Sequence, residues 1–429
     1  MKKVLLGTSA AALVAVAGPA MAAEWEITIG GYAEMELGFA STDINARRGG
    51  VEDLVGTEDF TTTTDEGTVF DEAGFDAAVD AAIDGLFGDE PDVDGVDLHR
   101  DIEIHFTAKI VLDNGLEFGA QAEIEAEPDG SSEHIDESEV FISGAFGEIV
   151  LGNEDAAGER MAFVAPDVGI IAANSGTMSQ FIQYDLTPGY SGSAFLTTSL
   201  NETFVNDDTG ITYFTPRLAG VQLGVSYFRD DNQDDGLDTD LNTESIAHIV
   251  SFGANYVQSF GGVDVAVSGF YSFAQSQVDG VEDPEIYGFG ANFGFGGFTL
   301  GGSWGQGNDL AVLGIAPDGS VSTGALIGGD GNGWDVGVSY ETGPWAVSAT
   351  FFRGKVDTFL VTDTGFDSEG NEFVEVFGYE EELNLINVSG TYALAQGVTL
   401  VAEGGYADYE NAIADADGFF IGTGVDLSF

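Results

Sequence analysis

Carboxylates are the functional groups that this sequence supplies in greatest number. It contains 74 Asp and Glu against 11 Lys and Arg, a formal net charge of −63 at neutral pH. Such a surplus attracts cations and repels polyanions, which excludes nucleic acid as a partner. Carboxylate pairs are too common here to indicate a glycosidase. Cys is absent, the four His show no zinc-ligand spacing, and no nucleophile elbow or phosphate loop occurs, so we expect no enzyme and no required cofactor.

Two acidic stretches loosely follow the spacing of a calcium-binding loop. The first contains Glu90, Asp92 and Asp94, the second contains Asp231 and Asp235, and each is followed by a glycine. Neither has the glutamate expected at the twelfth position or a flanking pair of helices. Ca²⁺ at loops outside the cell is a weak hypothesis, and solvated charge is the simpler interpretation.

The first 22 residues have the features of a secretory signal peptide. Lys2 and Lys3 precede an apolar run over residues 4–17, and Ala20-Met21-Ala22 forms a cleavage site. We expect cleavage there, which leaves a mature chain of residues 23–429. The alternative, an uncleaved anchor, fits less well because the run is short for a bilayer.

Period-two alternation of apolar and polar residues predicts β-strands through most of the mature chain. It is clearest at residues 418–429, where Phe419, Ile421, Leu427 and Phe429 share one face. We expect this strand to pair with the first and to leave no free edge. Alternation alone fits a soluble sandwich or a membrane barrel. Segments of about ten residues, short turns that alternate with long acidic loops, and aromatic residues near segment ends favour the barrel.

Seven short turns and eight long connections predict an all-β fold, a 16-stranded antiparallel transmembrane barrel. A further hairpin at residues 178–187 and 193–200 would raise the number to eighteen. In the first long connection, residues 41–97, apolar residues at helical spacing predict an amphipathic helix over residues 70–87 at the barrel mouth. The expected strands lie near 25–40, 98–112, 115–127, 134–143, 147–152, 209–216, 219–229, 245–260, 262–274, 285–295, 297–306, 332–342, 344–354, 380–394, 397–408 and 418–429. The expected aromatic girdles contain Tyr227, Phe228, Tyr271, Phe273, Trp304, Trp345, Tyr406 and Tyr409.

Several segments resemble the Gram-negative general porins, in particular the alphaproteobacterial (Rhodobacter-type) group. They are G-G-Y-A-E-M-E-L-G at 30–38, D-N-G-L-E-F-G-A at 113–120, V-F-I-S-G-A-F-G-E-I-V-L-G at 140–152, R-L-A-G-V-Q-L-G-V-S-Y at 217–227, G-W-D-V-G-V-S-Y at 333–340, and the C-terminal strand. The resemblance implies a homotrimeric outer-membrane barrel in contact with lipid and lipopolysaccharide. It also implies that residues 153–208 form a constriction loop folded into the pore, and that Phe429 is read by the barrel assembly machinery.

The residues expected to line the pore are mostly acidic. In the constriction loop they are Glu154, Asp155, Glu159 and Asp167, with Arg160 as the basic exception. On the wall, alternation places these side chains inward: Glu34, Glu36, Glu103, Lys109, Glu117, Glu123 and Glu125. Rings of carboxylates concentrate cations, so we expect a cation-selective channel for small hydrophilic solutes. The alternatives are a substrate-selective porin and a secreted, acidic, all-β calcium-binding or adhesive surface protein.

Overall fold

The computed structural model describes residues 24–56, 60–64, 67–87, 93–125, 135–200, 204–205, 208–230, 245–278, 280–316, 320–322, 325–366 and 372–429. The proposed signal peptide therefore lies outside the described residues. So do four of the five residues of the weak calcium hypothesis, Glu90, Asp92, Asp231 and Asp235. The fifth, Asp94, is an exposed residue of a strand.

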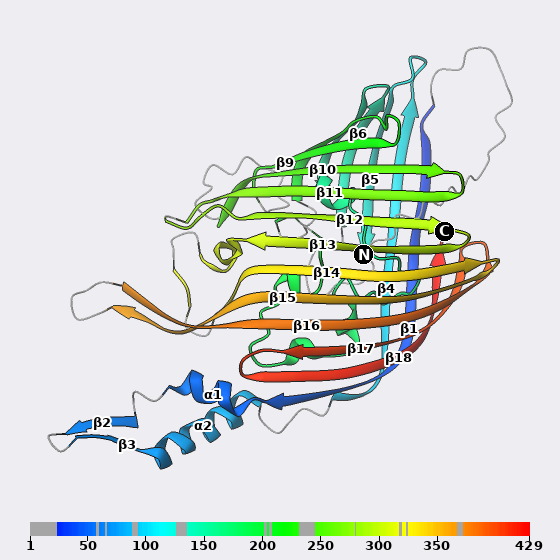
Figure 1. The fold of residues 1–429 in the computed structure, drawn as a ribbon. Coiled ribbons are helices and arrows are strands. Elements are labelled where there is room, and N and C mark those ends of the chain that lie inside the picture. The colour runs from blue at the N-terminus through cyan, green and yellow to red at the C-terminus, as the bar shows by residue number, and fades with distance from the viewer. Residues whose placement is uncertain are drawn as a thin grey trace.

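The described strands form a closed antiparallel barrel of sixteen strands, as the sequence predicts (Figure 1). Every expected short turn lies between two consecutive barrel strands. The barrel strands are β1 (Glu26–Ala46), β4 (Val93–Val111), β5 (Glu117–Glu125), β6 (Ile135–Gly144), β7 (Gly147–Glu154), β8 (Asp208–Phe214), β9 (Val221–Phe228), β10 (Ile246–Phe260), β11 (Val263–Ser276), β12 (Glu285–Phe295), β13 (Phe298–Asn308), β14 (Leu326–Thr342), β15 (Trp345–Phe366), β16 (Glu372–Ala395), β17 (Val398–Glu410) and β18 (Ala414–Ser428).

The first and last strands close the barrel. β18 pairs with β1 from Tyr32 opposite Ser428 to Ala46 opposite Ala414, and β1 pairs on its other side with β4. Gly31 N donates to Phe429 O at 3.0 Å, and Phe429 N donates to Gly31 O at 3.1 Å. The expected pairing of the C-terminal strand with the first is therefore confirmed.

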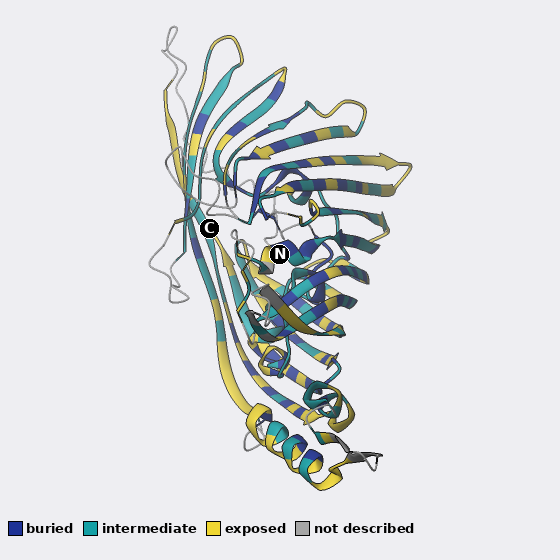
Figure 2. Ribbon diagram, turned by 90° about the vertical axis from the view of Figure 1, so that its left-hand side faces the viewer, coloured by how far each residue is buried: buried dark blue, intermediate teal, exposed yellow. Residues whose placement is uncertain are grey.

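Alternate side chains along the strands face opposite sides of the barrel wall, and the outward side is apolar. Phe289, Leu300, Val338, Val388 and Ile421 are 41–65% exposed. Figure 2 shows the resulting alternation of buried and exposed residues along the strands. An exposed apolar surface that follows the whole wall requires a lipid environment. It argues against the secreted soluble protein, whose apolar face would be inside.

Apolar side chains fill part of the barrel interior. Residues 155–200 enter the barrel, and their apolar side chains pack against inward-facing residues of β9 to β18 such as Phe228, Phe352, Leu385 and Phe420. The expected hairpin of this segment is wrong. Its described part contains a short helix α3 (Ala157–Arg160) and the 3₁₀ turns η2 (Thr177–Gln180), η3 (Tyr184–Leu186) and η4 (Ala194–Leu196). The segment forms turns rather than strands because the backbone groups of the wall strands are already paired with one another. The wall can therefore bond to this segment through its side chains.

Three expected connections are shorter than predicted because strand pairing continues into them. β1 extends to Ala46 and β4 begins at Val93, so both ends of residues 41–97 belong to strands. β15 and β16 pair to Phe366 and Glu372, well into the predicted connection 355–379. The expected connection 409–417 is reduced to residues 411–413. The acidic sequence of these extensions is compatible with strands that leave the membrane.

A small lobe projects beyond the ends of β1 and β18 (Figure 1). It contains α1 (Arg48–Val55), the hairpin β2 (Thr61–Thr64) and β3 (Gly67–Phe70), and α2 (Glu72–Phe87). The predicted helix is confirmed by α2, which buries Phe75 and Val79 on its apolar side. Arg48 of α1 ties the two helices together through Asp76 and Asp80. Among the described helices, none has the length and hydrophobicity needed to cross a bilayer.

Most of the expected girdle aromatics face outward, with two exceptions. Tyr227, Tyr271 and Tyr406 are exposed at 40–42%, as interfacial residues should be. Phe228 and Tyr409 are fully buried inside the barrel, so their assignment to a girdle is wrong. The physical reason is that a strand neighbour of an outward residue must point inward.

Candidate functional site

Backbone N–H groups of the inner segment, residues 155–200, bond to side chains of the wall one strand after another. Ala157 donates to Ser226 Oγ on β9 at 2.8 Å, and Gly158 donates to Ser251 Oγ on β10 at 3.1 Å. The segment then passes β11, β14, β15 and β17. The next donations are Phe163 to Ser268 Oγ at 2.8 Å, Ala165 to Asp335 Oδ2 at 2.9 Å, Val168 to Ser348 Oγ at 3.1 Å, and Ile170 and Ile171 to Glu403 Oε1 at 2.9 and 3.0 Å. The segment therefore follows the inner wall.

Inward-facing glycines give the segment room to approach the wall. A Cβ atom on Gly305 of β13 would overlap the carbonyl oxygen of Ser199, and one on Gly354 of β15 would overlap that of Phe195. Backbone can lie this close to a strand only where no side chain intervenes. Glycine at these positions therefore determines how far the segment narrows the passage.

A buried polar network fixes the middle of the segment. Asp335 Oδ2 accepts from Asn174 Nδ2 at 2.7 Å, and Asn174 Oδ1 accepts from Ser199 N at 2.9 Å. Asn174 and, through it, Ser199 are thereby joined to one carboxylate of β14, which also accepts from Ala165 N. A fully satisfied buried network of this kind rigidifies the backbone around it.

Arg160 lies beside two buried carboxylates at the start of the segment. Its Nη1 pairs with Glu154 of β7 and lies 3.7 Å from Glu139 Oε2 of β6. Its guanidinium also lies 5.0 Å from the centre of the Phe214 ring. Of the predicted loop residues, the structure therefore brings Glu154 and Arg160 into contact.

Replacing Arg160 by Gln should destabilise the protein by about 1–2 kcal/mol. Removing one partner of a buried ion pair leaves the other charge uncompensated, a penalty that the partial exposure of Arg160 reduces. Guanidinium unfolding in detergent micelles measures the change. Arg217→Gln, at an exposed turn, is the control and should stay within about 0.5 kcal/mol. Equal losses for both variants would contradict the role given to Arg160.

Asp167 points at the wall, where it bonds with β15 and β16. Its Oδ1 accepts from Gly169 N at 2.9 Å and from the Ser348 hydroxyl at 3.1 Å. Burial raises the pKa of the Asp167 carboxyl above its usual range, and the bonds from Gly169 and Ser348 oppose that rise. Asp155 precedes α3 and Glu159 belongs to it, and both are partly exposed.

The predicted wall residues all lie on the inward face, as alternation requires. Their surroundings differ. Glu36 is fully buried beside Glu403. Glu34, Glu117 and Glu125 are half-buried, and Lys109 Nζ lies 3.9 Å from Glu26 Oε2. Glu103 and Glu123 are buried around His105.

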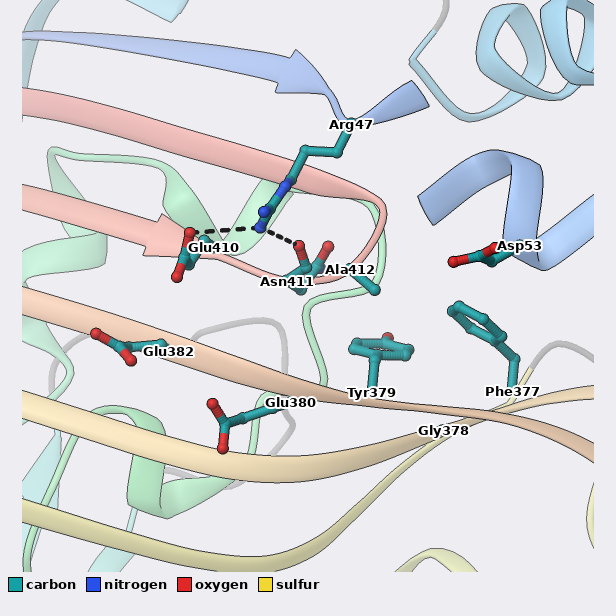
Figure 3. A pocket seen from close by; sticks show the side chains of 10 residues that line it. All are labelled: Arg47, Asp53, Phe377, Gly378, Tyr379, Glu380, Glu382, Glu410, Asn411 and Ala412. Carbon is teal, nitrogen blue, oxygen red and sulfur yellow. Dashed lines mark hydrogen bonds and ion pairs between the residues drawn. The ribbon is translucent and has the colours of Figure 1, made fainter. Parts of the chain in front are cut away.

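A surface pocket of about 380 Å³ lies beside α1 at the rim, between it and β16 and β17 (Figure 3). The Arg47 side chain lines the pocket, and its Nη1 donates to Glu410 Oε2 at 3.3 Å and to Asn411 O at 2.8 Å. Phe377 and Tyr379 contribute aromatic rings, which lie 5.7 Å apart. The pocket is another acidic surface, and its Tyr379 and Asn411 also donate to Gly189 O and Pro188 O of the inner segment.

The residues that anchor the inner segment are not predicted from the sequence. Ser226, Ser251, Ser268 and Ser348 are ordinary polar residues of alternating strands, and Glu403 is one acid among many. A signal was present, because β9 to β15 carry hydroxyl and glycine residues on the inward positions where β4 and β5 carry acids. That difference marks the part of the wall covered by the segment.

A family model described as Gram-negative porin matches residues 9–412. Among solved structures, OmpT, an outer membrane protein of Vibrio cholerae in a trimer form, is similar with a TM-score of 0.51 at 12% identity, over 94% of this chain and 99% of that one. The anion-selective porin from Comamonas acidovorans has a TM-score of 0.50 at 14% identity, over 95% and 100%. At these identities the two structures support the fold alone. No curated protein matches the chain. Because the family match covers most of the sequence, this chain belongs to the Gram-negative porin family.

Proposed function

We propose that this porin is an outer-membrane diffusion channel for small hydrophilic solutes and ions, with a preference for cations. Membership of the porin family supports a channel rather than an enzyme. The preference rests on one observation, the acidic inward face of β1, β4 and β5. There Glu34, Glu117 and Glu125 are half-buried, and the inward base Lys109 lies near another acid, Glu26. Carboxylates along a water-filled passage attract cations and repel anions.

Reversal potentials of reconstituted channels in a tenfold KCl gradient test this preference. We expect a potential of the sign that K⁺ selectivity gives. One carboxylate about 4 Å from a permeating ion in water contributes about 1 kcal/mol, a roughly fivefold preference. The preference should weaken at 1 M salt, where the screening length falls to about 3 Å.

Variants connect the selectivity to the wall. Changing Glu34, Glu117 and Glu125 together to Gln should move the reversal potential toward zero. Glu380→Gln, on the outside of β16, is the matched control and should leave the potential unchanged. An anion preference in the unaltered channel would refute the carboxylate argument without refuting the channel.

One alternative, a substrate-selective porin, concerns the same pore. A substrate-selective porin would show conductance block by its solute at low concentration, whereas a general channel would not. The similar Comamonas porin is anion-selective, so the shared fold does not determine the sign of the selectivity. The sign must come from side chains, which are the basis of the proposal.

The remaining features follow from family membership and from the sequence. Signal peptidase removes residues 1–22, and the mature chain forms a homotrimer in the outer membrane, in contact with lipid and lipopolysaccharide. A trimer form of a structurally similar protein supports this assembly. Phe429 is read by the barrel assembly machinery, and the alphaproteobacterial (Rhodobacter-type) group is the proposed subfamily. Cross-linking of purified protein tests the trimer, and mass spectrometry tests the cleavage site.

A further inference from the structure

One imidazole lies between two buried carboxylates on the inward face of β4 and β5. His105 Nε2 is 3.1 Å from Glu103 Oε1 and 3.6 Å from Glu123 Oε2. The register explains the cluster, because His105 is directly opposite Glu123 and two residues from Glu103 on the same face. Glu103 is 0% exposed and Glu123 5% exposed.

The contacts of His105 have the spacing of metal ligands rather than the geometry of hydrogen bonds. Its Nε2 is enclosed and makes no hydrogen bond of acceptable angle with any residue that the structure describes. Two ligands about 2.0–2.1 Å from one metal ion, at 90–110° to each other, are separated by roughly 2.9–3.4 Å. The distance from His105 to Glu103 lies in this range, and the distance to Glu123 is slightly longer. The ligand atoms of Glu103, His105 and Glu123 all lie within 4.8 Å of one another.

Neighbouring residues hold the three ligands in orientation. Thr107 Oγ1 donates to Gln121 Oε1 at 3.0 Å, and Gln121 Nε2 donates to Glu123 Oε1 at 2.6 Å, which leaves Oε2 facing the imidazole. The ring of Tyr32 packs edge-on against the His105 ring, with 6.2 Å between the ring centres. Such outer partners fix ligand orientation in known metal sites.

The charge around the cluster also suits a cation. Glu103 belongs to a second convergent group with Glu125 and Asp136. Glu103 and Glu125 are directly opposite each other on neighbouring strands, a position where like charges are destabilising. A divalent ion at Glu103 would offset the repulsion in both groups.

We infer that Glu103, His105 and Glu123 form a binding site for a divalent transition-metal ion of the Zn²⁺ class on the pore wall. An imidazole nitrogen with two carboxylate oxygens suits Zn²⁺ or Cu²⁺, whereas Ca²⁺ and Mg²⁺ prefer oxygen ligands alone. The site is distinct from the calcium hypothesis for the acidic loops. It goes beyond the channel function and does not depend on the sign of the selectivity.

Zn²⁺ itself is the probe, titrated into the full folded protein in detergent micelles by equilibrium dialysis, with excess Ca²⁺ present to occupy non-specific acidic sites. We expect one Zn²⁺ per chain to remain bound. His105→Ala and Glu123→Gln should each weaken binding on the order of tenfold or more. Heat-modifiable migration on a gel confirms that each variant is folded.

Matched controls separate this site from general acidity. Glu117→Gln removes the same charge from the same face of β5, and His248→Gln removes an imidazole elsewhere, so both should bind as the unaltered chain does. Cu²⁺ electron paramagnetic resonance should show nitrogen coupling that His105→Ala abolishes. Displacement of all Zn²⁺ by Ca²⁺, or unchanged binding in His105→Ala, would overturn the inference.

Discussion

Glu403→Ala is expected to destabilise the folded barrel by about 3–5 kcal/mol and to raise its single-channel conductance. Glu403 Oε1 accepts the N–H groups of Ile170 and Ile171, and Oε2 accepts the Ser389 hydroxyl at 2.8 Å. Hydrogen bonds to a charged acceptor contribute about 1.5–3 kcal/mol each, and these donors would lose their acceptor inside the barrel. The released segment would stop narrowing the passage. Guanidinium unfolding and planar-bilayer recordings measure the two effects.

Two further variants make the Glu403 experiment specific. Glu403→Gln keeps an oxygen acceptor and should lose less stability than the alanine variant. Glu380→Ala removes a glutamate of β16 whose partner, Lys355 Nζ at 2.6 Å, lies on the outside of the barrel. An exposed ion pair contributes at most about 1 kcal/mol. If Glu403→Ala and Glu380→Ala behaved alike in both measurements, Glu403 would not anchor the segment.

Phe195→Ala should be equally damaging, at about 3–5 kcal/mol. Phe195 belongs to η4 and is fully buried against β13, β14 and β15 in the core inside the barrel, together with Phe352 and Val356. Truncation would leave a cavity that the strands, held by their ladder bonds, cannot close. The free energy of unfolding in micelles measures the loss.

Phe289 provides the matched comparison for Phe195. It is a phenylalanine of β12 that is 60% exposed on the outward face. Detergent or lipid fills the space after Phe289→Ala, so only the transfer contribution of about 1.5–3 kcal/mol is lost. A smaller loss for Phe195→Ala than for Phe289→Ala would show that the interior core does not stabilise the fold.

Much of the barrel could be predicted from alternation and turn residues. The seven turns and α2 follow from local patterns, because short turns and helices depend on few neighbouring residues. The strand pair that closes the barrel joins the two ends of the barrel sequence and follows from the alternation of both strands and the need to leave no free edge. Strand ends were less predictable. The connection predicted at residues 355–379 contains acidic residues such as Asp363 and Glu375, yet these two are backbone partners in β15 and β16. Strand pairing outside the membrane needs no apolar face, and therefore leaves no clear pattern.

The path of the inner segment could not be predicted for a different reason. Met178, Phe181 and Leu196 belong to stretches whose pattern predicts a hairpin, but they are buried against β-strands that are distant in sequence. Alternation predicts that Glu36 faces a water-filled pore. In the structure Glu36 is fully buried, and this burial depends on the tertiary packing of the barrel interior. Alternation along a strand determines on which face of the wall a side chain lies. The segment that covers the side chain depends on the whole fold.

Many of the hydrogen bonds between the inner segment and the wall are donated by its main chain, as with Ala157, Phe163 and Val168. Every residue type except proline supplies the same N–H group. Side chains of the segment that point away from the wall can therefore be exchanged while the backbone keeps its position. Permeation properties can in this way diversify, by evolution or by engineering, on an aperture whose shape stays fixed.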